Sequence, residues 1–228
     1  MPINNDQQRS SGSNADIIVR YLTHPQVRIE PLKDVRRWSL NEIGNARVAA
    51  LAASDALKGT TRIISSTETK ATQTAQPLAD ALRCWLELRE QMHENDRSAT
   101  GYLPEQQFEQ CADAFFAHPD QSIGGWETAR MAQRRIVWEV GEVLRSHRSG
   151  DILIVGHGTV GTLLFCALAN LPITRAYDQM QGGGNVFSFR TSQCVPLSGW
   201  RPMESLACPS TEIQTEAPAS DAIFGWAS

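Results

Sequence analysis

The sequence predicts a three-layer α/β/α fold with a mainly parallel sheet. Two observations carry this prediction. Short apolar runs rich in β-branched residues alternate with longer segments of helical periodicity. Two of the short runs, residues 17–22 and 151–155, are each followed within two residues by a histidine, His24 and His157. Ligand and catalytic groups of open α/β sheets lie at the carboxyl ends of the strands, so we expect both histidines to share one pocket there.

Each element follows from a local signal. Residues 17–22 are the first strand, and Ser39 and Glu42 make a capping box for a helix that runs to about residue 57. Apolar runs predict further strands at residues 62–66, 84–88, 151–155 and 185–190. Helical spacing of apolar residues predicts helices at residues 67–82, 104–117, 126–147 and 159–171.

These elements place one domain at residues 15–200, in which residues 90–125 are the expected insertion or lid. Residues 1–14 are rich in Ser, Asn and Gln, which predicts a disordered N-terminus. Residues 201–228 are rich in Pro, Ser, Thr and Glu, which predicts a loosely ordered tail.

Composition excludes several classes of function. The net charge of -4 provides no basic field for nucleic acid. No apolar run approaches the roughly 20 residues that a membrane helix needs, and the polar N-terminus lacks the apolar core of a secretory signal. The five cysteines are scattered and form no CxxC pair, which indicates free thiols and a cytoplasmic location. The oligomeric state is left open.

The turn at His157 has two interpretations. Gly156 and Gly158 let the backbone turn sharply at a helix N-terminus, whose N–H groups suit an anion. Residues 156–161 also spell GxGxxG, the dinucleotide fingerprint. A nucleotide site is disfavoured, because this turn comes late in the chain and the next strand ends without an acidic residue for a ribose hydroxyl.

A second strand-to-helix turn, at residues 65–75 (SSTETKATQTA), combines hydroxyls with Lys70. Such groups at a helix N-terminus suit a phosphate, although simple capping with a solvated lysine explains the same residues. His93, Glu94 and Asp96 also suggest metal ligands, but their spacing matches no known metal-binding pattern, and we expect no metal and no organic cofactor.

Taken together, these motifs resemble the histidine phosphatase superfamily, which has the phosphoglycerate mutase-like fold. Thr23-His24-Pro25 stands where the family has Arg-His-Gly. Residues 40–48 (LNEIGNARV) are similar to its Leu-Thr-Glu-x-Gly helix start, and residues 65–75 are similar to Ser-Ser-Pro-x-x-Arg-Ala-x-Gln-Thr-Ala. Residues 155–158 (VGHG) match Val-x-His-Gly, and Asn185 precedes the last strand as in the family. The resemblance covers about residues 16–190.

The resemblance implies hydrolysis of a small phosphomonoester, or of a phosphoprotein, through a phosphohistidine. His24 would attack phosphorus, and His157 would hold the phosphoryl oxygens. Glu90, in a Leu-x-Glu context, is the first candidate for the general acid, and Glu94 is the second. The predicted phosphate-binding residues are Thr23, Lys70, Arg28, Gly158 and Asn185.

The chain departs from the family pattern at three positions. Thr23 and Lys70 replace two arginines, and Pro25 replaces a glycine. Arginine offers phosphate a planar bidentate fork, whereas lysine offers only a point charge and threonine a neutral hydroxyl. We expect Arg28, Arg36 or Arg37 to enter the pocket in compensation. The alternative is a catalytically impaired module that binds a phosphorylated ligand or protein on the same fold.

Overall fold

A computed structural model of the chain describes residues 16–207. Six strands form one sheet in the order β3-β2-β4-β1-β5-β6. Their bounds are β1 Ile18–Thr23, β2 Thr60–Ser66, β3 Leu86–Arg89, β4 Asp151–Gly156, β5 Asn185–Arg190 and β6 Arg201–Pro202. Strands β1 to β4 pair in parallel, and β5 and β6 run antiparallel to their neighbours. The predicted α/β fold with a mainly parallel sheet is confirmed.

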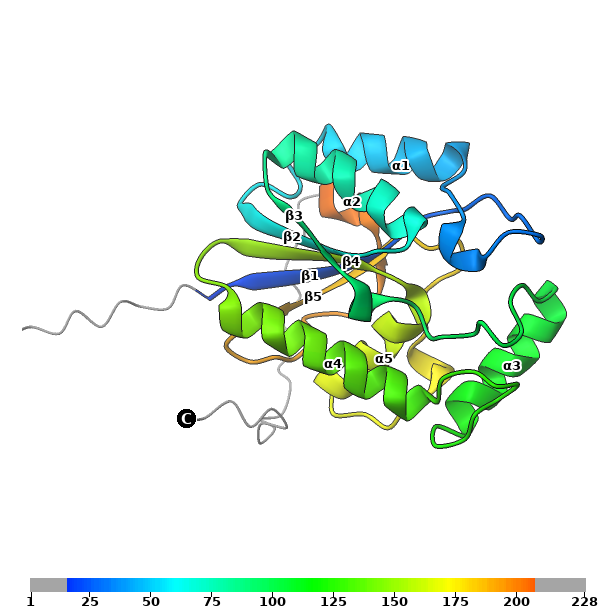
Figure 1. Cartoon of the computed structure of the whole chain (residues 1–228). Helices are drawn as coiled ribbons and strands as arrows, with labels where there is room; N and C mark the ends of the chain where they lie inside the picture. The colour runs from blue at the N-terminus through cyan, green and yellow to red at the C-terminus, as the bar shows by residue number, and fades with distance from the viewer. Residues whose placement is uncertain (1–15, 208–228) are drawn as a thin grey trace, which may run out of the picture.

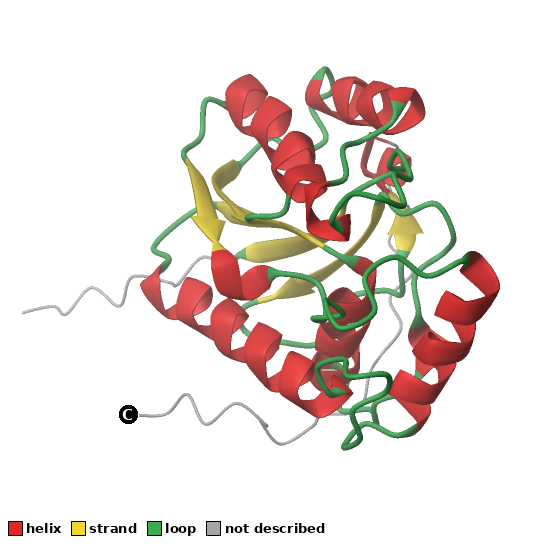
Figure 2. Cartoon of the chain, turned by 45° about the vertical axis from the view of Figure 1, so that its right-hand side comes forward, coloured by secondary structure: helices red, strands yellow, loops and turns green. Residues whose placement is uncertain are grey.

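Helices cover both faces of the sheet (Figures 1 and 2). Helices α1 (Glu42–Ala52) and α2 (Thr69–Leu82) lie on one face, and α4 (Ala129–Ser146) and α5 (Gly158–Leu168) lie on the other. Helix α3 (Glu105–Ala117) lies beyond the carboxyl edge of the sheet on the side of α4 and α5. Within residues 16–207 there are also four short 3-10 helices: η1 Val35–Arg37, η2 Glu90–Met92, η3 Arg175–Tyr177 and η4 Met203–Ala207.

Strand β4 shows why the central strands read as continuous apolar runs. Ile152 and Ile154 belong to the core beneath α4 and α5, whereas Leu153 and Val155 belong to the core beneath α1 and α2. Successive side chains of a strand point to opposite faces, so a strand covered on both faces must be apolar at every position. Helices on both faces therefore explain the sequence pattern.

Several helix ends differ from the sequence-based expectation. The N-cap of α1 is Asn41, whose side chain accepts the N–H of Gly44; Ser39 does not cap this helix. Helix α4 begins later than expected because Thr128 caps it by accepting the N–H of Met131. Helix α1 ends at Ala52 rather than near residue 57.

The domain also extends beyond the boundary expected at residue 200. Strand β6 pairs with β5, and Met203 of η4 is fully buried. Arg47 of α1 forms an ion pair with Glu204, which ties this segment to the domain. The predicted disordered N-terminus (1–14) and the rest of the predicted tail (208–228) lie outside the described residues.

Other predictions concern thiols and membranes. Cys84, Cys111, Cys166 and Cys194 are free thiols, and Cys208 lies outside the described residues. Among the helices of residues 16–207, none combines the length and the apolar character needed to cross a bilayer. The cytoplasmic location and the role of residues 90–125 as a lid stay predictions.

Candidate active site

The two histidines predicted to share a pocket lie side by side at the carboxyl edge of the sheet. Strands β1 and β4 are parallel neighbours whose last paired residues are Thr23 and Gly156, so each histidine is the next residue of its chain. The N–H of His24 donates to the carbonyl oxygen of Gly156 over 3.0 Å. The ring centroids of His24 and His157 are 5.3 Å apart, with 67° between the ring planes.

The hydrogen bonds of His24 determine which of its nitrogens is free. Its Nδ1 lies 2.9 Å from the carbonyl oxygen of Pro25. A carbonyl only accepts hydrogen bonds, so Nδ1 carries the proton and Nε2 keeps an unprotonated lone pair. Burial is the main cause that lowers the pKa of His24 to about 3, and electrostatic interaction with His157 and Lys70 lowers it further. His24 is therefore a neutral imidazole across the physiological pH range.

His157 is fully buried and is held through its backbone and one ring nitrogen. The hydroxyl of Tyr21 donates to the carbonyl oxygen of His157 and accepts its N–H, each over 3.2 Å. Nε2 lies 2.8 Å from Oγ of Ser66, and Nδ1 is buried without a hydrogen-bond partner in the described residues. Burial is the main cause that lowers the pKa of His157 to about 3. Buried polar atoms normally have a hydrogen-bond partner, so a buried ring nitrogen without one is typical of a site that binds a polar ligand.

Lys70, at the position of a family arginine, is paired inside the protein. Its Nζ donates to Oε2 of Glu68 over 2.5 Å and to the carbonyl oxygen of Val35 over 2.8 Å. Both side chains of this ion pair are buried, with exposed fractions of 5% for Lys70 and 4% for Glu68. The charge of Lys70 is therefore already balanced by a carboxylate within the site.

Glu68 itself was not identified from the sequence, although it stands two residues before Lys70 in the quoted motif. Its Oε1 lies 3.7 Å from Nε2 of His157. Burial alone would raise the pKa of Glu68, but the charges of His157 and Lys70 and the N–H of Glu94 outweigh burial and bring it to about 2. Glu68 is a carboxylate at neutral pH.

The two candidate acids lie in different places. Glu94 reaches the N-terminus of α5, where its carboxylate accepts the N–H groups of Thr159 and Val160 over 3.2 and 3.1 Å. Glu90 is exposed on η2 and lines the outer pocket. Helix α5 begins directly after His157, so Glu94 is the candidate carboxylate that lies beside the histidine pair.

Gln179 links three of the predicted phosphate-binding residues and was not found from the sequence. Its Oε1 accepts from Oγ1 of Thr23 over 2.6 Å and from Nδ2 of Asn185 over 3.2 Å. A Cβ atom on Gly158 would lie 2.2 Å from Nε2 of Gln179, so the amide nitrogen stands directly over this glycine. Gln179 lies in a loop without periodicity, and no sequence signal marks it.

Gly158 is the first residue of α5, and its own N–H has no acceptor within residues 16–207. Thr23 and Asn185 are buried against each other, because Oγ1 of Thr23 accepts the N–H of Asn185 over 3.0 Å. Both side chains therefore contact the site through Gln179, and the N–H of Gly158 remains available to an anion.

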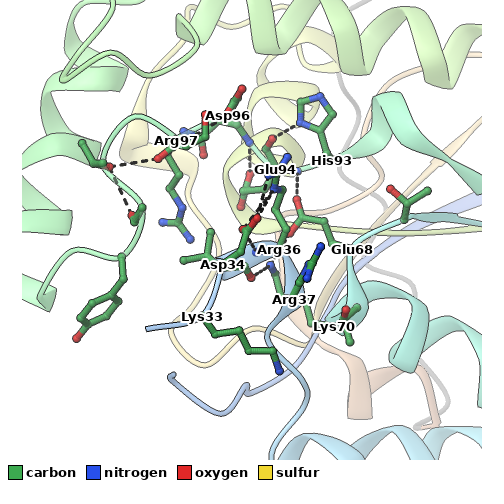
Figure 3. A pocket seen from close by; sticks show the side chains of 18 of the residues that line it. Lys33, Asp34, Arg36, Arg37, Glu68, Lys70, His93, Glu94, Asp96 and Arg97 are labelled. Carbon is green, nitrogen blue, oxygen red and sulfur yellow. Dashed lines mark hydrogen bonds and ion pairs between the residues drawn. The ribbon is translucent and has the colours of Figure 1, made fainter. Parts of the chain in front are cut away.

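A cavity of about 770 Å³ opens beside the histidine pair and is shown in Figure 3. Its walls come from residues 31–37, 67–70, 90–91, 93–98 and 100–102. Arg36 and Arg37 line the cavity, but Arg28 does not, and Arg36 is paired with Asp34. Of the three compensating arginines expected from the sequence, two therefore face this cavity. Within residues 16–207 no group of three or more His, Cys, Asp or Glu side chains is placed to hold a metal ion.

Comparison with known proteins agrees with this architecture. The sequence model of the histidine phosphatase superfamily (branch 1) matches residues 26–196. No curated protein matches the chain.

Similar solved structures include three proteins of this architecture. Mycobacterial glucosyl-3-phosphoglycerate phosphatase is 19% identical, with 82% of this chain and 96% of that chain covered and a TM-score of 0.66. Bacillus stearothermophilus YhfR is 17% identical over 79% and 94%, with a TM-score of 0.67. Phosphoserine phosphatase from Entamoeba histolytica, in complex with 3-phosphoglyceric acid, is 16% identical over 83% and 99%, with a TM-score of 0.67. At these identities the likeness establishes the fold.

Proposed function

We propose, from the premise that this chain belongs to the histidine phosphatase superfamily, that it hydrolyses phosphomonoesters through a phosphohistidine on His24. One observation carries the proposal: an imidazole with a free Nε2 faces a second, buried imidazole with 5.3 Å between ring centroids. A neutral imidazole is a competent nucleophile at pH 7, and its pKa of about 3 keeps it unprotonated.

The reaction has two balanced steps. The lone pair on Nε2 of His24 forms a bond to phosphorus as the bond to the ester oxygen breaks, and a carboxylic acid gives that oxygen its proton. The resulting carboxylate then takes a proton from water, whose oxygen attacks phosphorus and releases His24 and inorganic phosphate. No metal or organic cofactor is required for either step.

Neutral hydrogen-bond donors replace the two family arginines around the phosphoryl group. The candidates are Nδ1 of His157, the N–H of Gly158 and the side-chain amide of Gln179, whose oxygen is occupied by Thr23 and Asn185. Because the side-chain oxygen of Gln179 accepts both of these hydrogen bonds, the N–H groups of the same amide are available to the ligand. Donors fixed before the reaction stabilise charge that develops in the transition state.

Glu94 is the proposed general acid. Its hydrogen bonds to the first turn of α5 support this choice, since they place the carboxyl group next to the turn that carries His157. Glu90 is exposed and has no such contact. The choice reverses the preference that the Leu-x-Glu motif suggests.

One observation favours the alternative, a module that binds a phosphorylated ligand or phosphoprotein without turnover. The buried ion pair with Glu68 balances the charge of Lys70, the lysine that stands at the position of a family arginine. Losing one charge-assisted contact to the transition state costs on the order of 3 kcal/mol, or about 10²-fold in rate.

The test measures phosphate release from a panel of phosphomonoesters in the presence of chelator, for the wild type and for His24→Ala. We expect turnover by the wild type and its loss in the variant, together with an acid-labile phosphorus–nitrogen signal in ³¹P NMR of the quenched wild type. Binding of inorganic phosphate without turnover of any ester would support the alternative. Turnover that survives His24→Ala would exclude the phosphohistidine route.

A further inference from the structure

Arg97 lines the cavity, and its guanidinium has no hydrogen-bond or ion-pair partner among residues 16–207. Figure 3 shows its side chain directed into the cavity from the loop that follows Glu94. Its Nε is buried and has no hydrogen-bond partner within residues 16–207. The guanidinium lies over the ring of Phe108, with 4.8 Å between Cζ and the ring centroid.

Apart from the exposed Glu90, the carboxylates that line the cavity with Arg97 have other partners. Glu68 pairs with Lys70, and Glu94 accepts two N–H groups from α5. Asp34 pairs with Arg36, and Asp96 accepts the N–H of Ser98. The charge of Arg97 is therefore not neutralised by a contact within the described residues. A partly desolvated cation without a partner is unfavourable, so a ligand anion would gain from binding there.

The loop holds Arg97 in place before any ligand arrives. The carbonyl oxygen of Arg97 accepts the N–H groups of Thr100 and Gly101, and Thr100 accepts the indole N–H of Trp126 through Oγ1. Trp126 is buried in the core. A guanidinium fixed on a core-anchored loop loses little freedom on binding, which favours bidentate recognition of a carboxylate or phosphate.

Arg97 lines the cavity, whereas His24 and His157 do not, and its positive charge is near enough to His157 to contribute to the lowered pKa of that histidine. Glu68, Lys70 and Glu94 line the cavity, and Oε1 of Glu68 lies 3.7 Å from Nε2 of His157. A phosphoryl group between the two imidazoles would leave the rest of the substrate to extend past Glu94 into the cavity. The guanidinium of Arg97 faces that part of the substrate.

We propose that the substrate is a phosphomonoester with a second acidic group, a carboxylate or another phosphate, and that Arg97 binds this group. The inference rests on the proposed function, since it assumes that the phosphoryl group lies at His24. It defines the substrate class as small phosphomonoesters that carry at least one negative charge beyond those of the transferred phosphoryl group. Arg37 lines the same cavity and adds positive charge around the second acidic group, whereas Arg36 is paired with Asp34.

The test uses two substrates that differ in one group: 3-phosphoglycerate, with a carboxylate, and glycerol 3-phosphate, with a hydroxymethyl group in its place. We expect the wild type to have the higher kcat/KM for 3-phosphoglycerate. Hydrogen bonds to charged groups are worth about 1.5–3 kcal/mol, so Arg97→Gln should lower this preference by about 10- to 100-fold. The control, Arg130→Gln, removes an exposed arginine that pairs with Asp120 on the surface and should keep the preference.

Two results would overturn the inference: a wild type without preference for the acidic ester, or equal losses on both esters in Arg97→Gln. Equal losses would place Arg97 on the transferred phosphoryl group. Calorimetric binding of the same two esters to His24→Ala repeats the comparison without turnover. That arm tests Arg97 even if the protein proves to be a binding module, so failure of the inference and failure of the proposed function are distinguishable.

Discussion

The histidine pair and the loop at residues 90–102 form two sides of one site, but they are held by different forces. His24 and His157 each follow a buried parallel strand, and the backbone register of β1 and β4 brings them together. Glu94 and Arg97 lie on a loop whose shape depends on side-chain contacts with α4. The comparison shows that a regular sheet positions the proposed nucleophile. A loop segment without regular secondary structure positions the groups that we expect to transfer protons and to determine substrate specificity.

Arg135 of α4 is the main support of that loop. Its Nη1 donates to the carbonyl oxygens of Gln91 and His93 over 2.7 and 2.9 Å. Its Nε and Nη2 donate to the carboxylate of Glu127 over 3.0 and 2.7 Å. Only 12% of each side chain of this ion pair is exposed. One guanidinium therefore fixes the conformation of the loop, whereas a row of backbone hydrogen bonds fixes the strands.

The largest effect on activity is expected from substitution of Glu94, the carboxylate on the loop. Glu94→Gln keeps the shape of the side chain but removes the proton donor, and general acid–base catalysis typically contributes 10²- to 10⁴-fold. We expect kcat to fall by about 10²- to 10³-fold. The matched variant Glu90→Gln should keep kcat within about twofold, because Glu90 is exposed. Steady-state kinetics of both variants decide the assignment, and the opposite ranking would return the role to Glu90.

The next prediction concerns how much the ion pair of Arg135 with Glu127 stabilises the protein. Arg135→Met fills a similar volume but removes the donor to Glu127 and to the carbonyl oxygens of residues 91, 93 and 94, and breaking a largely buried ion pair costs about 3 kcal/mol. Urea unfolding measures this loss. Arg130→Met, which removes an exposed pair with Asp120, should cost less than about 1 kcal/mol. Equal costs in the two variants would show that Arg135 does not anchor the loop.

A smaller effect tests the neutral donors on the histidine side. Gln179→Glu keeps both acceptor interactions with Thr23 and Asn185 but replaces the amide donors with a carboxylate oxygen. Repulsion of the phosphoryl group should weaken binding of inorganic phosphate by about 10-fold or more. Gln193→Glu adds the same charge at an exposed position and should leave binding within about twofold. Unchanged phosphate affinity in Gln179→Glu would remove this side chain from the site.

The last prediction concerns the pH dependence of stability. The folded-state pKa of both histidines is about 3, below the ordinary value of 6.5, so between these values the unfolded chain binds more protons than the folded one. Stability should therefore fall as pH decreases from 6.5 towards 3, and the low pKa of Glu68 adds a loss between 4.5 and 2. His24→Gln should flatten the slope by at most about 1.4 kcal/mol per pH unit. The midpoints of urea unfolding at pH 4–7 test this prediction. An unchanged slope in His24→Gln would mean that the pKa of His24 is not lowered in the folded protein.

The fold was largely predictable because its signals are local. The apolar runs before His24 and His157 identify buried strands, and a strand followed by a helix predicts parallel pairing. The motif at residues 65–75 correctly indicated a strand-to-helix turn at the site. The same motif also contained Glu68, but a carboxylate two residues before Lys70 has no meaning until the fold shows that the two side chains are buried together.

What the sequence by itself determined is the scaffold and the pair of histidines, since strand and helix periods repeat over a few residues and need no distant partner. Only the tertiary structure decided which groups complete the site. Gln179 meets Thr23 across 156 positions of the chain, and Glu94 meets Thr159 across 65. Such contacts depend on how loops pack against a finished sheet, and no local pattern encodes them. Arg97 is a further example, because only the folded chain shows that its buried Nε has no hydrogen-bond partner within residues 16–207.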